Sequence, residues 1–518
     1  MTRTRSRAVL AGIARREWVL QMLALGAAAG CRRSDDPAYA RGNTLVIAIR
    51  DVSEVKPDAE DLDFLYCPRL AVMDENGDLQ PQLAQSWEHS ADYLEWTYHL
   101  RTDVRWSDGV PVTAHDVKFT LDLLSHPDVR EYVFDAVAVV DDYTVKIRAG
   151  GILNGGAQDD ISYFPKHVLE NLEPKKFREW DYWLRPKVSA GPYRFLRYVP
   201  ETMMEFEANS TYFRGKPKIE RLVYKFVGQA DLNELLSGNV DIANGNPTRI
   251  AFVAKDPRFL VYQRLTRAGM AIYWKCDHPL FRDVRVRRAL TLAIDRRALL
   301  GVLDLPSDLP LIDGVLTQRQ FLRRQFPEPL PYDPAQARAL LEAAGWQDRN
   351  GDGVREREGR PFDFTAIVRS TEQYSRLAIY VQAQLRQVGV QMEVQILDLP
   401  LVWNRLDAGA FEAVVDFQRS LPFAQRKYYG RDNPVGYQNP EVFRLTNQVV
   451  ATADPDELDR IYRALTEIFR AELPVTPLVP LTGTTFAHRR VGGLSTLFRA
   501  YGSGYSGYIE DLWLEQQP

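Results

Sequence analysis

The stretch IYVQAQLRQVGVQMEVQILDL, residues 379–399, contains the pattern that decides the fold class. An apolar stripe of helical spacing runs into it and ends at Gly389, and apolar residues alternate with polar ones directly after that glycine. The stripe consists of Leu377, Val381, Leu385 and Val388, and the alternating face consists of Val390, Met392, Val394 and Ile396. A helix that leads into a strand through one glycine is typical of an α/β fold.

The same alternation of helix and strand signals occurs elsewhere in the chain. Residues 96–100 place apolar side chains at every second position, which predicts a strand. Thr113 and Asp116 have the capping-box spacing at the start of a predicted helix, and Asp333 caps another helix that ends before Gly345. These regions support the α/β interpretation.

The N-terminal residues have the composition of an export signal. Five arginines precede a mostly apolar stretch over residues 18–30. This stretch is too short to cross a bilayer core of about 30 Å. It ends in Ala28-Ala29-Gly30-Cys31, which resembles a bacterial lipobox. The resemblance implies a lipoprotein signal peptide over residues 1–30 and a lipid on Cys31.

Two alternatives remain open for this segment. Arg15-Arg16 resembles a twin-arginine export motif, so the sequence does not decide between the folded and unfolded export routes. The segment would instead be a buried N-terminal helix if the cysteine were incidental. Residues 31–41 are polar and lack periodicity, which predicts a tether between the lipid and the fold.

The composition narrows the class of partner. The 518 residues carry a formal net charge of −4, and removal of residues 1–30 makes the chain more acidic. No basic surplus is left to bind phosphates, which argues against a nucleic-acid partner. Besides Cys31 only Cys67 and Cys276 are present, so the chain is not a disulfide scaffold, and the sequence does not show whether these two pair. No other apolar run reaches the length of a transmembrane helix.

Five blocks of sequence match one family in the same order. The blocks are residues 79–121 (LQPQLAQSWEHSADYLEWTYHLRTDVRWSDGVPVTAHDVKFTL), 189–227 (SAGPYRFLRYVPETMMEFEANSTYFRGKPKIERLVYKFV), 281–295 (FRDVRVRRALTLAID), 332–346 (YDPAQARALLEAAGW) and 379–399. They cover most of the mature chain. The chain resembles the extracellular solute-binding proteins of ABC transporters, family 5, which include oligopeptide- and dipeptide-binding proteins.

The resemblance implies a two-lobed periplasmic-binding-protein fold (type II, cluster C-like) with an extra β-rich subdomain in lobe one. Ligand is held between the two lobes in this fold. The two crossings between lobes are expected near residues 273–276 and 481–483. The expected division is residues 42–80, 190–275 and 484–518 for lobe one, 81–189 for the inserted subdomain, and 276–483 for lobe two.

The resemblance also raises a question about the ligand. Family members that bind peptides pair an aspartate of lobe two with the ligand's amino terminus, and by position that aspartate falls near Leu421. This chain has no carboxylate there but has Arg419 and Arg426 nearby. Because a guanidinium suits carboxylate or phosphate, a solute with an anionic or sugar-like group is an alternative to a peptide. Asp416 is the remaining candidate for an amino-terminus anchor.

The same comparison suggests which side chains line the cleft. Trp403 matches a family tryptophan, and the end of the following strand is expected to face the ligand. For each aromatic candidate the alternative is core packing. The candidate ligand-binding residues are Trp403, Phe417, Gln418, Arg419 and Ser420 from lobe two, and Tyr66 and Tyr505 from lobe one.

Other motifs give no support for catalysis or metal binding. Residues 502–507 satisfy G-x-G-x-x-G, but no helix is expected after them. Residues 348–353 begin like an EF-hand calcium loop, yet its twelfth position is Gly359. No metal-binding histidine spacing and no nucleophile elbow occur, so we expect no catalytic residue, metal or cofactor. Three signature segments, residues 106–109, 191–193 and 285–295, are predicted to be turns and a packed helix.

These observations predict a lipid-anchored receptor on the periplasmic or extracellular face of a bacterial membrane. It would capture a peptide or another small polar solute as a monomer and deliver it to the permease subunits of an ABC transporter. Three alternatives remain: an oligosaccharide or anionic-solute binder of the same fold, a binding protein that reports to a sensor, and a secreted hydrolase with a carboxylate pair in its cleft.

Overall fold

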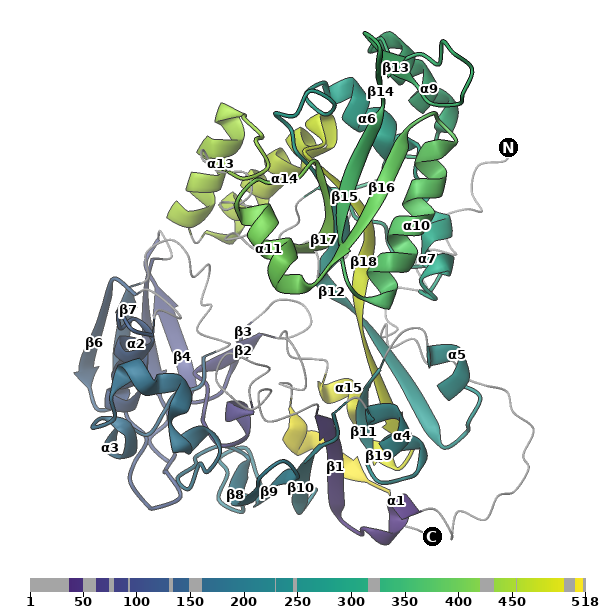
Figure 1. The fold of residues 1–518 in the computed structure, drawn as a ribbon. Coiled ribbons are helices and arrows are strands. Elements are labelled where there is room, and N and C mark those ends of the chain that lie inside the picture. The colour runs from purple at the N-terminus through teal and green to yellow at the C-terminus, as the bar shows by residue number, and fades with distance from the viewer. Residues whose placement is uncertain are drawn as a thin grey trace, which may run out of the picture.

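Figure 1 shows two lobes joined by two long strands. The computed structural model describes residues 37–49, 62–73, 79–91, 94–129, 134–148, 161–228, 230–245, 249–314, 327–419, 433–452, 454–497 and 508–515. Helices and strands alternate in both lobes, so the α/β prediction is confirmed. None of the helices in these ranges is long and apolar enough to cross a bilayer.

One mixed sheet extends through both lobes. Its ten strands, in order across the sheet, are β16 (Gln391–Leu397), β15 (Asp363–Arg369), β17 (Ala413–Arg419), β12 (Phe259–Trp274), β18 (Val475–His488), β11 (Ile242–Gly245), β1 (Thr44–Ile49), β10 (Arg221–Phe226), β9 (Met203–Ala208) and β8 (Tyr193–Val199). The strands β12 and β18 pair antiparallel from Phe259 opposite His488 to Tyr273 opposite Val475. This ribbon is the connection between the lobes.

The ribbon is irregular between its two ends. The pairing of β12 with β18 shifts register between Leu265 and Gly269 and again after Met270. On the opposite strand, Pro477 and Pro480 lie among the paired residues, and proline has no N–H to donate to a neighbouring strand. The register shifts and the prolines therefore interrupt the ladder in the same stretch.

Each lobe has its own hydrophobic core. The lobe-two core takes residues of β12 from Met270 onward and residues of β18 up to Val479. Phe259 and Phe486 instead belong to a core of lobe one. The change of core on β18 thus lies close to the predicted crossing at 481–483, while on β12 it lies before Met270 and earlier than 273–276. The predicted limits of the lobes and the subdomain stay a prediction.

The stretch quoted first folds as predicted. Helix α10 (Glu372–Arg386) is capped by Thr371, and Gly389 has a φ of +81° where the chain turns into β16. The predicted strand face is buried at Met392, but Ile396, near the end of the edge strand β16, is half exposed. The other helices of lobe two are α6 (Val284–Leu292), α7 (Arg296–Val302), α9 (Pro334–Ala343), α11 (Leu399–Asp407), α13 (Pro440–Ala451) and α14 (Pro455–Glu472), with a small hairpin of β13 (Glu356–Arg357) and β14 (Arg360–Pro361).

The inserted region contains an antiparallel sheet with helices against it. Its strands, in spatial order, are β4 (Ala84–His89), β5 (Glu95–Leu100), β7 (Thr144–Arg148) and β6 (Ala136–Asp141), and its helices are α2 (Ala114–Leu124) and α3 (Lys166–Leu169). The capping box of α2 is confirmed, because the Thr113 hydroxyl accepts from the His115 N–H while Asp116 accepts from the Thr113 N–H. The alternating residues Trp96, Tyr98 and Leu100 are all buried, as predicted.

Lobe one is completed by short elements from the first half of the chain and from its C-terminal part. These are α1 (Pro37–Ala40), β2 (Ala71–Met73), β3 (Leu79–Pro81), α4 (Asp231–Leu236), α5 (Ile250–Val253), β19 (Val491–Gly492), α15 (Leu494–Leu497) and β20 (Trp513–Leu514). Cys67 lies in the core of lobe one and Cys276 in the core of lobe two, and both are free thiols. Cys67 and Cys276 therefore do not form a disulfide with each other in this structure.

The predicted structural role of the signature residues is confirmed. The N–H groups of Ala190 and Gly191 both donate to the carbonyl oxygen of Tyr66, at 2.8 and 3.1 Å. A Cβ atom on Gly191 would lie 2.4 Å from the carbonyl oxygen of Leu65, so only glycine fits. In the third segment the predicted core stripe of Val286, Ala289, Leu290, Ala293 and Ile294 is buried.

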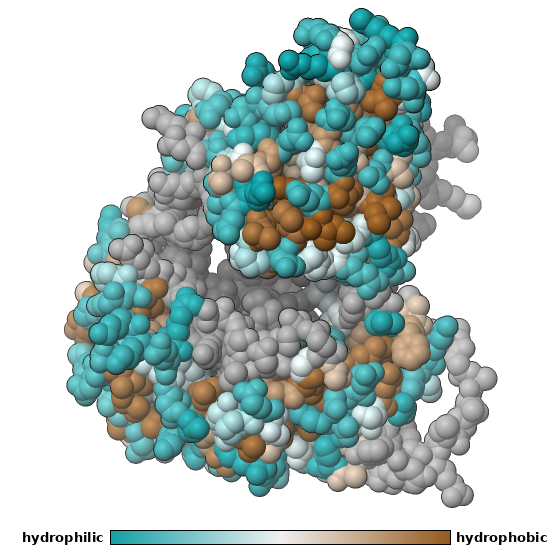
Figure 2. All heavy atoms as spheres, viewed as in Figure 1, coloured by the Kyte–Doolittle hydropathy of each residue, from teal (hydrophilic) through white to brown (hydrophobic). Residues whose placement is uncertain are grey.

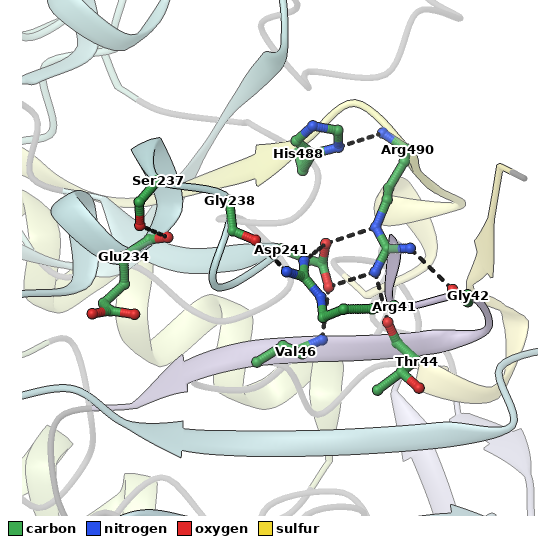
Figure 3. Close-up of polar contacts among 10 residues, drawn as sticks. All are labelled: Arg41, Gly42, Thr44, Val46, Glu234, Ser237, Gly238, Asp241, His488 and Arg490. Atoms are coloured by element: carbon green, nitrogen blue, oxygen red, sulfur yellow. Dashed lines mark hydrogen bonds and ion pairs between the residues drawn. The ribbon is translucent and has the colours of Figure 1, made fainter. Parts of the chain in front are cut away.

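A buried carboxylate joins three parts of lobe one (Figure 3). Asp241 accepts from the Arg490 guanidinium at 2.7 and 2.9 Å, and from the Arg41 guanidinium at 2.6 Å. The N–H of Val46 on β1 donates to the same carboxylate at 2.8 Å. The first described residues, the start of β11 and the end of β18 are thereby fixed to one another.

Candidate functional site

The sheet order places three strand ends of lobe two opposite lobe one. β15 is parallel to both β16 and β17, so the three carboxyl ends lie at one edge. β17 is antiparallel to β12, and its last residue, Arg419, pairs with Ala268 just before β12 enters the lobe-two core. The carboxyl ends therefore point toward lobe one, and Figure 2 shows a hollow between the lobes at this level. Ligands of open α/β sheets bind outside such carboxyl ends.

An arginine and an aspartate meet at this edge. The register pairs Val368 with Val415, so the next residues, Arg369 and Asp416, are neighbours on β15 and β17. The Arg369 Nε atom lies 3.4 Å from Asp416 Oδ1. Asp416 is only 3% exposed, whereas the Arg369 side chain is 20% exposed. The carboxylate is therefore inside the lobe, and the guanidinium lies between it and the surface.

A tyrosine from the first turn of α10 supports the guanidinium. The Arg369 Cζ atom lies 5.3 Å from the centre of the Tyr374 ring. Tyr374 is buried, and burial raises the pKa of its hydroxyl above the usual range, with the nearby Asp416 charge as a second cause. Tyr374 therefore stays a neutral aromatic surface for the cation.

Helix α11 (Leu399–Asp407) follows the carboxyl end of β16 at the same edge of the sheet. It begins directly after β16, where the Ser370 hydroxyl donates to Asp398 Oδ1 at 2.7 Å and fixes the two strand ends together. Trp403 on this helix is 47% exposed, so its ring is not part of the core. Figure 2 shows apolar side chains gathered over α10, β16 and α11 beside the hollow. The exposed large apolar residues of these elements include Ile379, Ile396, Leu401 and Trp403.

The predicted strand-end residues of lobe two lie at this edge as far as the structure describes them. Phe417 is half buried, and its carbonyl oxygen accepts from the Tyr273 hydroxyl at 3.2 Å. The backbone of Gln418 and Arg419 continues β17. Ser420, Tyr505 and Cys31, like residues 421–432 and the 502–507 motif, lie outside the described residues.

Two predicted site residues are placed in protein interiors. Tyr66 is 1% exposed and packs in lobe one between Tyr182 and Phe206, with ring centres at 5.7 and 6.4 Å. The alternative of core packing therefore describes Tyr66 in this structure. Asp416 is buried beside Arg369, so its carboxylate is not presented to a ligand's ammonium group.

The sequence reasoning did not include Arg369 and Tyr374. One signal was available, because Arg369 ends an apolar strand two residues before Thr371, which caps the next helix.

The loop that resembles the start of an EF-hand is held by its own hydrogen bonds, since Asp348 accepts from the N–H groups of Gly351 and Gly353. Within the described ranges no three histidine, cysteine or acidic residues gather as a metal site.

Comparisons with known proteins agree with this architecture. Residues 78–420 match the family "Bacterial extracellular solute-binding proteins, family 5 Middle". The oligopeptide-binding protein AppA of Bacillus subtilis is 24% identical over 456 residues, which is 84% of this chain and 83% of AppA.

Solved structures extend the match to nearly the whole chain. AppA in complex with a nonapeptide superposes with a TM-score of 0.67 at 22% identity, covering 91% of this chain and 99% of AppA. NikZ from Campylobacter jejuni in complex with Ni(L-His) superposes with a TM-score of 0.72 at 23% identity and the same coverage. With a family match over more than half of its length and the two-lobed fold around a shared sheet, this chain belongs to the bacterial extracellular solute-binding proteins of family 5.

Proposed function

We propose that the protein is a receptor that captures a peptide or another small polar solute between its lobes and delivers it to an ABC permease. A lipid on Cys31 would keep it on the outer side of a bacterial membrane, near that permease. The observation that supports the proposal most directly is the lobe-two edge, where Arg369 and the end of β17 lie at strand ends that point toward lobe one.

The chemistry of this edge is that of a binding site. Trp403 on α11 is a half-exposed apolar side chain, and Arg369 at the end of β15 is a partly exposed cation. The similar protein AppA was solved with a nonapeptide and NikZ with Ni(L-His). Solutes of both kinds therefore belong in a ligand screen for this chain.

A thermal-shift screen of the purified protein tests the capture of a solute. The panel contains di- to pentapeptides, oligosaccharides, small organic acids and metal-histidine complexes. A ligand at 100 times its dissociation constant adds about 2.7 kcal/mol to the free energy of unfolding, which raises the melting temperature measurably. A protein that responds to no member of the panel would contradict the proposal. Mass spectrometry of the recovered ligand separates binding from hydrolysis, because an enzyme would return a cleaved product.

A second experiment concerns the anchor. Cells that produce the parent protein should incorporate radiolabelled fatty acid into it, and the Cys31→Ala variant should remain unlabelled. The Cys67→Ala variant is the matched control, because that thiol is buried in lobe one. Equal labelling of the Cys31→Ala variant would remove the lipid from the proposal and leave solute capture standing.

A further inference from the structure

We propose that the groove between α2 and α3 is a second binding site, whose ligand is a free amino acid with an apolar side chain, such as phenylalanine or leucine. Both helices belong to the inserted region and lie away from the ends of β15 and β17 (Figure 1). The site is therefore separate from the lobe-two edge and goes beyond the solute capture proposed above.

The groove has the size of a small-ligand site. Its volume is about 320 Å³, near the lower end of the range of about 300–1,000 Å³ for such pockets. One wall is a single face of α2, because its side chains are spaced three and four positions apart. The members of this face are His115, Lys118, Phe119, Asp122, Leu123 and His126. The other walls come from α3 and from residues of the segment 172–180. A volume this small suits a small molecule better than a folded partner.

The interior of the groove is apolar. Leu123, Leu169 and Trp180 line it and are each more than nine-tenths buried. The indole N–H of Trp180 donates to the carbonyl oxygen of Glu173 at 3.1 Å, so the ring has no polar group left for a ligand. Leu172 also lines the groove but is 40% exposed. A bound apolar side chain would remove part of the Leu172 surface from water, which favours binding.

Two ion pairs line the groove together with these apolar residues. Lys118 Nζ lies 2.9 Å from Asp122 Oδ2, and Lys166 Nζ lies 2.9 Å from Glu170 Oε2. All four side chains are between 41% and 55% exposed, and such exposed pairs contribute little, so they can rearrange around a ligand.

The charges of the two pairs favour a zwitterion. A ligand with a single charge would meet groups of its own sign as well as groups of the opposite sign. An amino acid offers its carboxylate to a lysine and its ammonium group to an acid, and both charges lie next to the side chain that enters the apolar interior. The chemistry of the groove therefore matches an apolar amino acid.

The two histidines of the α2 face are engaged by other acids. His115 Nε2 lies 3.5 Å from Asp142 Oδ1, and His126 Nδ1 lies 3.7 Å from Asp128 Oδ2. Neither acid lines the groove. The lysines and their two acids are therefore the groups that we assign to the ligand's charges.

Equilibrium dialysis of the purified full chain with radiolabelled L-phenylalanine tests the inference. It measures both the affinity and the number of molecules bound per chain. The competitors are L-leucine, L-serine, 3-phenylpropanoate and phenethylamine. We expect L-leucine to compete and L-serine not to compete, because serine has no apolar side chain. The last two compounds each lack one charge of phenylalanine and should bind at least about tenfold more weakly, as expected for a lost charged hydrogen bond.

Matched variants locate the bound amino acid. Leu172→Lys places a charge in the groove and should remove one bound molecule per chain. Val168→Lys is the control, since Val168 on α3 is 38% exposed but does not line the groove. The double variant Asp122→Asn with Glu170→Gln changes only exposed side chains. It should weaken phenylalanine binding at least about tenfold and remove the preference for phenylalanine over 3-phenylpropanoate.

Each outcome decides for or against the groove. Loss of one bound molecule in Leu172→Lys but not in Val168→Lys supports the site, whether or not a second molecule binds between the lobes. If both lysine variants lose binding, the preference of the double variant decides. The inference is wrong if the parent binds no apolar amino acid, if Leu172→Lys binds as the parent does, or if a singly charged analogue binds as tightly as phenylalanine. Those results leave solute capture between the lobes intact, because the broad thermal-shift screen tests it separately.

Discussion

The Arg490 guanidinium and the Asp241 carboxylate form a buried ion pair, with Nε 2.7 Å from Oδ1 and side-chain exposures of 1% and 0%. The two residues are 249 positions apart in the chain. Arg490 also donates to the carbonyl oxygens of Gly42 and Thr44, so it connects the end of β18 to the first strand of the fold. Loss of the Arg490 side chain would leave Asp241 and the carbonyl oxygens of Gly42 and Thr44 without this hydrogen-bond donor.

We expect Arg490→Met to lower the free energy of unfolding by about 3–5 kcal/mol, because removing one partner leaves Asp241 short of its main counter-charge in the interior. Urea denaturation followed by circular dichroism measures the change. The neighbouring Arg489 is exposed and provides the matched control, since Arg489→Met should change stability by less than about 0.5 kcal/mol. Equal effects of the two substitutions would show that the buried pair contributes nothing special.

Glu510 should make the stability depend on pH. Burial raises its pKa from 4.5 to about 7, against the opposing effect of Arg214. A carboxyl group with a raised pKa binds its proton more tightly in the folded protein than in the unfolded chain. Its favourable contribution is therefore present at low pH and is lost as the pH rises from 4.5 to about 7. The shift corresponds to about 3 kcal/mol.

The Glu510→Gln variant cannot titrate at this position. As the pH rises across that range, the free energy of unfolding of the parent should therefore decrease relative to that of the Glu510→Gln variant. Glu515 is exposed near the same end of the chain, and Glu515→Gln serves as the control. A constant difference between the parent and Glu510→Gln across the range would contradict the raised pKa.

Gly191 and Gly109 should respond differently to alanine. A Cβ on Gly191 would meet the backbone of Leu65 at 2.4 Å, so Gly191→Ala must move one of two core segments and should cost about 2–3 kcal/mol. Gly109 has a φ of +91° but open space around its Cα, so Gly109→Ala should cost only about 1 kcal/mol of backbone strain. Chemical denaturation of both variants gives the comparison, and a cheaper substitution at Gly191 would refute the close contact.

The thiols of Cys67 and Cys276 should be unreactive in the folded protein. Burial raises the pKa of Cys67 well above its usual value and that of Cys276 to about 12, so neither forms a thiolate at pH 8. In a Cys31→Ser chain, Ellman's reagent should detect two thiols only after denaturant is added. The mass of the intact chain should be the same with and without reductant. A loss of two hydrogens in the unreduced sample would indicate a bridge and contradict the placement of the cysteines in separate cores.

The sequence predicted the features that depend on local spacing. The stripe of α10, the glycine turn at Gly389, the capping box at Thr113 and the alternating core of β5 all follow from residues a few positions apart. Positions set by neighbouring strands could not be read in this way. The closeness of Arg369 and Asp416 comes from the parallel pairing of β15 with β17, which 46 intervening residues conceal. Burial of Tyr66 depends similarly on Tyr182 and Phe206, far away in the chain.

The ribbon of β12 and β18 has a mechanical consequence. Its two strands are paired to each other, to β17 in lobe two and to β11 in lobe one, so an approach of one lobe to the other must bend this pair of strands. The register shifts beside Gly269 and the missing N–H donors of Pro477 and Pro480 leave fewer hydrogen bonds between the two strands here, so this stretch should bend most easily. The elastic restoring force of this short stretch, weighed against the contacts made with a captured solute, then sets how far the lobes stand apart.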